Sequence, residues 1–330
     1  MNIYIKHLFQ LLGERMSRRA LEYYAIQKIL SPVDNLLAWV MSSSVPSQVY
    51  YPPIFIIGAP RSGSTLLYQY LSLVLDVSYI SNMWAIFPRS GSHMFPGKTV
   101  PPVDFNSFYG NSAFLFGAHE GGSIFTQWFP DKDQHFTSAI PDLAKRGMRT
   151  YFETVSSIGK RPWLTKNVRN SMRIQVLKDV FPEGVYIRLK RDPLLIAQSI
   201  IEGRYKLTGS LENNFTVMPK EWESIRTLPY PRQVAQQVYY IEAQTDNDLA
   251  DVPAERVINC DYDAFCSAPF EFAVEVCKRW QFVHLRSDIP ETVKNKTFKV
   301  SRSIRLSSNI LDQITGEFER IKTESPSKIS

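Results

Sequence analysis

Several stretches of the chain begin with a short run of apolar residues and continue with the apolar rhythm of a helix. They span residues 54–75, 163–181 and 185–204, and a later strand over 256–261 precedes a helix that reaches Trp280. Short apolar runs are typical of buried strands, and alternating strands and helices predict a parallel sheet covered by helices on both faces. We therefore expect an α/β fold whose ligands bind beyond the carboxyl ends of the strands.

The other parts of the chain depart from this pattern. Residues 1–50 mix apolar and basic positions and predict an N-terminal helical segment, whereas residues 51–320 form the main domain. Within this domain, residues 85–160 include a stretch of clustered prolines, glycines and aromatic residues, which predicts an irregular insertion over the site. The polar residues 321–330 predict a flexible tail.

A glycine-containing turn follows the first apolar run. Gly58 and Gly63 have the spacing of a phosphate-binding loop, but Ser64 stands where nucleoside triphosphatases have lysine. Because the turn joins a strand to a helix, backbone N–H groups and the positive helix end should point at a bound anion. Arg61 is the cation within the loop. The loop predicts a phosphate site for a ligand other than ordinary ATP.

A second strand-to-helix turn occupies residues 185–199. The strand ends at Arg191, the dipeptide Asp192-Pro193 opens the helix, and Ser199 lies about two turns further on. With both motifs in this order, the chain resembles the PAPS-dependent sulfotransferases, especially the bacterial-type members. Pro60-Arg-Ser-Gly-Ser-Thr-Leu-Leu67 matches their P-[KR]-[ST]-G-[ST]-T-x-L signature, and the segment from Arg191 to Ser199 matches R-[DN]-P-x5-S.

The resemblance implies a P-loop-like sulfotransferase fold and the co-substrate 3′-phosphoadenosine 5′-phosphosulfate (PAPS), with no metal. In the family, the first signature binds the 5′-phosphosulfate, the second binds the 3′-phosphate, and a late basic loop closes over the latter. For residues 301–302 of that loop, a solvated basic segment is the alternative interpretation. The expected PAPS-binding residues are Pro60, Arg61, Ser62, Gly63, Ser64, Thr65, Leu66, Arg191, Ser199, Ser301 and Arg302.

The resemblance also implies catalytic residues. Lys166 matches a lysine that precedes the catalytic histidine in cytosolic members, but Val168 stands at the position of that histidine. Carboxylates serve as the base in several branches of the family, so Glu120 is the first candidate and His119 the second. A loop glutamate beside flexible glycines is the alternative interpretation of Glu120. Together with Arg61, Lys166 would supply positive charge to the transferred group.

Two further histidines, His93 and His135, are lesser candidates for the base, and an ordinary loop position is the alternative for each. The net charge of +6 suits an anionic co-substrate, an acidic acceptor or a membrane surface. It is too small an excess to predict nucleic-acid binding. The chain has three cysteines, which lack metal-ligand spacing and favour a reducing compartment.

No apolar run approaches the roughly 18 residues of a membrane span, and the N-terminus lacks the features of a signal peptide. We therefore expect a cytoplasmic protein. The amphipathic N-terminal helices are expected to dock on the body of the protein, with peripheral contact to a membrane surface as the alternative.

Together, these features predict an O-sulfotransferase that moves the sulfuryl group of PAPS to an acceptor hydroxyl and releases PAP. A glycan or glycolipid is the first candidate acceptor, because of the aromatic-rich insertion and the basic amphipathic start, and a lipid or other small molecule is the second. A P-loop kinase or NTPase is an alternative that Ser64 disfavours. A non-catalytic nucleotide-binding protein is a third hypothesis, which the missing histidine leaves open.

Overall fold

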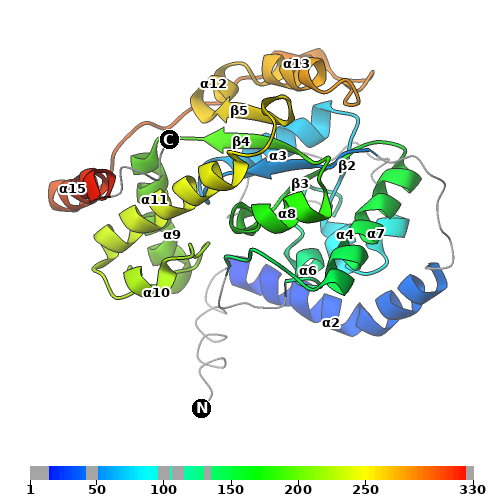
Figure 1. Cartoon of the computed structure of the whole chain (residues 1–330), viewed down its shortest axis with the longest axis horizontal. Helices are drawn as coiled ribbons and strands as arrows, with labels where there is room; N and C mark the ends of the chain where they lie inside the picture. The colour runs from blue at the N-terminus through cyan, green and yellow to red at the C-terminus, as the bar shows by residue number, and fades with distance from the viewer. Residues whose placement is uncertain (1–14, 42–50, 96–104, 106–114, 130–134, 325–330) are drawn as a thin grey trace.

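The computed structural model describes residues 15–41, 51–95, 105, 115–129 and 135–324. Within this part of the chain, one parallel sheet has the strand order β2-β3-β1-β4-β5 (Figure 1). Its strands are β1 (Ile54–Ile57), β2 (Ser78–Tyr79), β3 (Trp163–Lys166), β4 (Val185–Lys190) and β5 (Val257–Asp261). The predicted α/β fold with a parallel sheet is confirmed.

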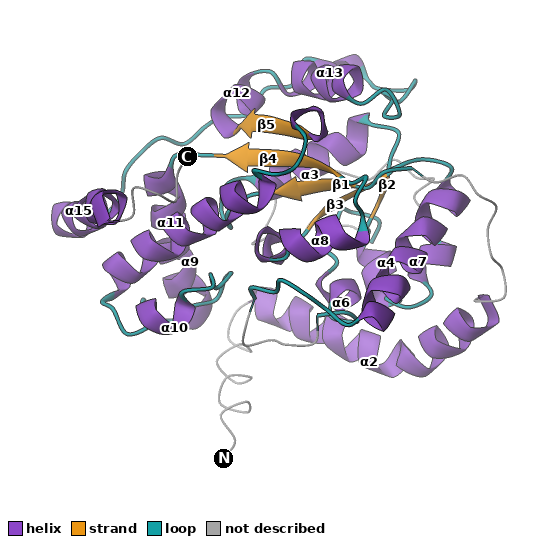
Figure 2. Cartoon of the chain, viewed as in Figure 1, coloured by secondary structure: helices purple, strands orange, loops and turns teal. Residues whose placement is uncertain are grey.

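Helices cover both faces of the sheet, as Figure 2 shows. The predicted helix after each of β1, β3, β4 and β5 is present in the structure. The α-helices are α2 (Arg15–Met41), α3 (Ser64–Val74), α4 (Asn82–Ile86), α5 (Gly91–Met94), α6 (Gly122–Phe125), α7 (Asp142–Gly159), α8 (Ile174–Val180), α9 (Pro193–Thr208), α10 (Trp222–Ile225), α11 (Tyr230–Leu249), α12 (Tyr262–Ser267), α13 (Pro269–Arg279), α14 (Glu291–Lys294) and α15 (Ser308–Glu324). The 3₁₀ helices are η1 (Val168–Met172) and η2 (Ala254–Arg256).

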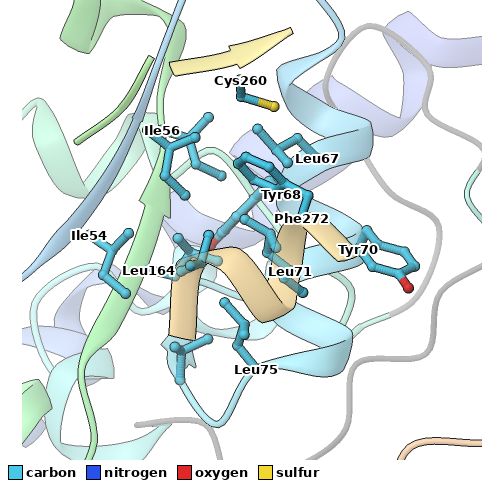
Figure 3. Close-up of a cluster of buried hydrophobic side chains, with 14 of the residues drawn as sticks. Ile54, Ile56, Leu67, Tyr68, Tyr70, Leu71, Leu75, Leu164, Cys260 and Phe272 are labelled. Atoms are coloured by element: carbon cyan, nitrogen blue, oxygen red, sulfur yellow. The ribbon is translucent and has the colours of Figure 1, made fainter. Parts of the chain in front are cut away.

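The central strand β1 is apolar on both faces because both are covered. Side chains alternate along a strand, so Ile54 and Ile56 pack with α3 and α13 (Figure 3), whereas Phe55 and Ile57 join the cluster under α7 and α8. Phe55 contacts the edge of the Trp163 ring of β3, with ring centroids 5.5 Å apart. The two clusters hold the strands in one register, so the carboxyl ends of β1, β3 and β4 meet at one edge of the sheet.

A third apolar cluster joins α9, α11 and α15 at one end of the molecule. The last helix, α15, continues to Glu324, with Ile321 2% exposed. Residues 321–324, predicted as part of a flexible tail, therefore form the last turn of a helix, because Ile321 anchors that turn in the protein. The rest of the predicted tail lies outside the described residues.

The predicted N-terminal segment contains α2, which lies against α4 (Figure 1). Asp34 is buried and accepts hydrogen bonds from the backbone N–H groups of Arg89 and Ser90. The opposite side of α2 exposes apolar side chains, including Ile29 and Trp39, each 74% exposed. Among the described residues, no helix combines the length and apolarity needed to cross a membrane.

The region predicted as an irregular insertion is regular at its end. Residues 142–159 form α7, whose apolar side packs into the cluster below β1 and β3. The short helices α5 and α6 lie earlier in the same region, and residues 96–104, 106–114 and 130–134 lie outside the described part. Among the described residues of this region, the cavity described next is lined by the segment 120–126, Phe105 and His135.

Candidate functional site

The turn between β1 and α3 has the backbone of an anion-binding loop. Gly63 has φ of 98°, and a Cβ there would lie 2.1 Å from the ring of Tyr262. A Cβ on Gly58 would lie 2.8 Å from the backbone oxygen of Leu189. Both positions therefore require glycine. The first N–H groups of α3 have no acceptor within their own helix, so they are available to an anion at this turn.

Hydrogen bonds to two neighbouring helices hold the loop in place. Ser171 of η1 accepts a hydrogen bond from the Gly58 N–H and donates one to the Gly58 oxygen. The Ala59 N–H donates to Glu242 of α11, at 3.2 Å. These contacts fix the loop to two helices that follow it by more than a hundred residues, so its conformation is set by the fold before any ligand binds.

A cavity of about 890 Å³ opens at the carboxyl edge of the sheet, above this loop. Its walls come from both predicted motifs, the segment around Glu120 and the loop before α11. The lining residues are Pro60, Arg61, Gly63, Ser64, Thr65, Leu66, Phe105, Glu120, Gly122, Thr126, His135, Lys166, Asn167, Val168, Arg169, Arg173, Arg191, Ser199, Leu207, Phe215, Thr216, Val217 and Tyr262. Five basic residues and one carboxylate face the same space, which makes it a strongly cationic site.

The two motifs meet directly in this cavity. The Arg61 Nε donates to the Ser199 Oγ at 2.9 Å, and the Arg191 Nη1 donates to the backbone oxygen of Arg61 at 3.1 Å. The Arg191 guanidinium also lies over the Tyr262 ring, 4.5 Å from its centroid. The same ring approaches Gly63, so Tyr262 positions an arginine of one motif and the turn of the other.

Lys166 joins the loop to the candidate base. Its side chain is only 3% exposed, and its Nζ donates to the Thr65 Oγ1 at 3.1 Å and forms a short ion pair with Glu120. Asn167 donates to the backbone oxygen of Glu120 at 3.1 Å, which fixes the carboxylate segment to the end of β3. Glu120 and Lys166, predicted on separate grounds, are therefore in contact at the centre of the cavity.

The histidines are less suited to remove a proton. The Nδ1 of His119 accepts a hydrogen bond from the Gly121 N–H at 2.9 Å, so Nε2 carries the proton of the neutral ring. Burial and the nearby Lys166 lower the pKa of His119 to about 4. His135 likewise accepts the Met218 N–H on its Nδ1, which leaves its Nε2 as a donor in the cavity wall. His93 lies on α5, away from the lining.

Three of the predicted PAPS-binding residues lie outside the cavity wall, as does His119. Ser62, within the loop, is fully buried. Arg302 is exposed and pairs with Asp263 of α12 at 2.8 Å, and the neighbouring Ser301 is exposed as well. The predicted contact of Ser301 and Arg302 with a ligand stays a prediction.

Sequence reasoning missed Arg169, Arg173 and Tyr262 as lining residues. Arg169 and Arg173 lie in the segment that follows β3, on η1 and at the start of α8, and Tyr262 follows β5 directly, at the start of α12. Their placement at the carboxyl edge was the available signal, but surface arginines and core tyrosines are far commoner than site residues. Within the described residues, no cluster of His, Cys, Asp and Glu side chains has the arrangement of a metal site.

Known proteins resemble the chain at the level of family and fold. The model of the sulfotransferase family matches residues 52–282. Sulfotransferase STF1 from Mycobacterium tuberculosis H37Rv is 14% identical, with 97% of this chain and 91% of that chain covered and a TM-score of 0.51. A sulfotransferase from Alicyclobacillus acidocaldarius is 17% identical over 84% of this chain and 96% of its own, with a TM-score of 0.44.

Sulfotransferase STF9 from Mycobacterium avium is 14% identical, with 90% of this chain and 81% of that chain covered and a TM-score of 0.48. No curated protein sequence gives a significant match. The likeness to the STF1 structure supports the fold, and the family model covers well over half of the chain. The chain belongs to the sulfotransferase family.

Proposed function

We propose that the protein transfers the sulfuryl group of PAPS to an acceptor hydroxyl and releases PAP. The observation that carries this proposal is the direct contact of Arg61 with Ser199 and of Arg191 with the Arg61 backbone, at 2.9 and 3.1 Å. A donor with phosphate groups at both the 5′ and 3′ positions of one ribose needs two anion sites close together on one surface. The two signature motifs provide them side by side in one cavity.

In this proposal, the cavity has two halves. The donor half comprises residues 60–66, Arg191, Ser199 and Tyr262, and would hold PAPS. The acceptor half comprises His135, Arg169, Arg173 and residues 215–217, and would receive the acceptor. We place the Lys166–Glu120 pair at their boundary, because Lys166 contacts Thr65 of the donor half and Glu120 acts electrostatically on Arg169 of the acceptor half.

This arrangement suits in-line transfer to a hydroxyl. The bond between the acceptor oxygen and sulfur forms while the bond from sulfur to the bridging oxygen of the 5′-phosphate breaks, and PAP leaves. The Glu120 carboxylate takes the hydroxyl proton. Lys166 and Arg61 offset the negative charge on the sulfuryl and bridging oxygens, as cations do in phosphoryl transfer. The chemistry requires no metal in this proposal.

Ligand-dependent melting tests the donor. PAP should raise the melting temperature of the protein, whereas ADP at the same concentration should raise it little, because ADP lacks the 3′-phosphate. Magnesium or EDTA should leave both results unchanged. Stabilisation by Mg·ATP together with indifference to PAP would contradict the proposal and favour a kinase or NTPase. Incubation with isotope-labelled PAPS and a cell extract then identifies the acceptor.

For the acceptor, a glycan or glycolipid remains our first hypothesis and a lipid or small molecule the second.

We also propose that α2 gives a cytoplasmic enzyme peripheral contact with a membrane. Its exposed apolar side chains, Ile29, Leu36 and Trp39 among them, support this hypothesis. Sedimentation with vesicles of anionic lipid should deplete the parent protein from solution, and Trp39→Ser should weaken that depletion. Equal sedimentation of both proteins would contradict membrane contact through this face.

A further inference from the structure

Among the described residues, three arginine side chains are almost completely buried, and their surroundings differ. Arg188 of β4 is 1% exposed and pairs with Glu242 and Asp246, each at 2.8 Å. Arg204 of α9 is 0% exposed and donates to the Leu211 oxygen and to Gln237, each at 3.1 Å. Burying a charge is costly unless it is paired and hydrogen-bonded. Arg188 meets this requirement through two carboxylates, whereas Arg204 has two neutral acceptors and a buried Nε without one.

Arg173 does not meet it. The side chain is 2% exposed, and among the described residues its guanidinium has no hydrogen bond or ion pair. Its Nε is buried without an acceptor, and its described contact is the Phe129 ring, whose centroid lies 4.1 Å from the guanidinium carbon. Burial and the neighbouring Arg169 lower the pKa of Arg173 to about 9, so the side chain still carries its charge at neutral pH.

Arg169 adds a second cation to the same wall. It precedes Arg173 by about one turn, it also lines the cavity, and no described residue accepts a hydrogen bond from its side chain. His135 contributes an N–H donor nearby in the lining, because its Nδ1 is already used as an acceptor. The Glu120 carboxylate acts on Arg169, but the two guanidinium groups together exceed that single charge, so this wall favours an anionic ligand over a neutral one.

The signature motifs do not use these side chains. The predicted 5′-phosphosulfate loop and Arg191 contact Ser199, Tyr262 and Lys166, whereas Arg169 and Arg173 line the same cavity from η1 and from the start of α8. We infer that Arg169 and Arg173 form a second anion subsite, which binds a carboxylate, phosphate or sulfate group that the acceptor already carries. This inference rests on the proposed sulfotransferase function and names the substrate class: an anionic acceptor with a free hydroxyl.

Binding of inorganic phosphate tests the subsite without any knowledge of the acceptor. Phosphate is titrated into the PAP-saturated protein against potassium chloride of equal ionic strength, and the melting temperature is recorded. Phosphate should stabilise the parent protein, and Arg173→Met or Arg169→Met should weaken apparent phosphate binding at least tenfold. Arg226→Met removes an exposed arginine outside the cavity and should leave phosphate binding unchanged. PAP affinity should be the same in all four proteins.

The possible failures are distinct. If the parent is indifferent to phosphate, or if both cavity variants respond as the parent does, the subsite inference is wrong. If Arg173→Met instead weakens PAP binding tenfold, Arg173 belongs to the donor half and the inference is again wrong. If PAP itself does not bind, the proposed function fails, and the difference between parent and variants in phosphate alone still decides whether the subsite exists.

The labelled product gives an independent test. Product formed from isotope-labelled PAPS and a cell extract should carry at least one negative charge besides the new sulfate, as measured by anion-exchange elution. Loss of that extra charge after phosphatase treatment identifies a phosphate, and loss after carbodiimide-mediated amidation identifies a carboxylate. A charge that resists both treatments identifies an existing sulfate. A labelled product with the sulfate as its sole charge would overturn the inference while leaving the sulfotransferase proposal intact.

Discussion

The donor and acceptor halves of the cavity hold their cations in different ways. In the donor half, Arg61 and Arg191 are bound to Ser199, to the loop backbone and to the Tyr262 ring. In the acceptor half, the guanidinium groups of Arg169 and Arg173 lack hydrogen-bond acceptors among the described residues. The first arrangement is preorganised by the fold. The second retains buried charge at the expense of stability, as is common where a ligand supplies the missing partner.

The largest expected effect lies at the boundary between the halves. Glu120→Gln should lower turnover by about 10² to 10⁴, because the amide cannot take the hydroxyl proton. PAP binding should persist, since Glu120 contacts Lys166 rather than the signature loop. Single-turnover rates with labelled PAPS and titration with PAP measure the two quantities. Near-parental turnover would remove Glu120 from the role of base.

The buried arginines give the sharpest contrast in stability. Arg188→Met should destabilise the protein by about 3 kcal/mol, because it leaves Glu242 without its cation and Asp246 with Lys190 alone. Arg173→Met should leave stability unchanged or increase it, because it removes a buried charge that the described protein does not pair. Urea denaturation of both variants measures the difference. A loss of several kcal/mol in Arg173→Met would mean that a group of the chain pairs with Arg173, and the contrast between the halves would disappear.

The donor half can be tested by removing its 3′-phosphate contact. Arg191→Ala should weaken PAP binding by more than tenfold, since a charge-assisted hydrogen bond contributes about 1.5 to 3 kcal/mol. Binding of ADP should change much less, so the two ligands become nearly equivalent. Calorimetric titration of parent and variant with each ligand provides the comparison. An equal loss for PAP and ADP would assign Arg191 to the 5′ side of the ligand.

Several features of the fold were predictable from the sequence because they depend on local pattern. The buried strands β1, β3, β4 and β5 are short apolar runs followed by turns. The strand β2 has only two residues and leaves no such run. The helix α11 buries glutamines such as Gln236 and Gln237, whose partners come from other segments, so its apolar rhythm is weak.

The site also has features that the local sequence pattern predicts and features that it does not. The contact between Arg61 and Ser199 was foreseeable because both belong to signature motifs. The lack of a partner for Arg173 could not be predicted. Arg188 carries the same charge and is equally buried, and only the tertiary structure shows which of the two has carboxylates nearby. Pairing of a buried charge is a property of segments far apart in sequence, so no local pattern reports it.

The smallest expected effect concerns His119, next to the boundary carboxylate. His119→Gln should change turnover by less than tenfold, because the glutamine oxygen can still accept the Gly121 N–H that His119 accepts. The effect of the substitution should appear in the free energy of unfolding instead. The pKa of His119 is lowered to about 4 in the folded protein, against about 6.5 in the unfolded chain.

Between these two values the unfolded chain binds a proton that the folded protein does not, so stability falls as the pH drops from 6.5 toward 4. At pH 5 the parent should therefore have lost about 1 to 2 kcal/mol more than His119→Gln, relative to pH 7.5. Urea denaturation of both proteins at the two pH values measures this difference. Equal losses of stability in the two proteins would mean that His119 ionises freely in the folded protein. A large loss of turnover in His119→Gln would assign the role of general base to His119 rather than to Glu120.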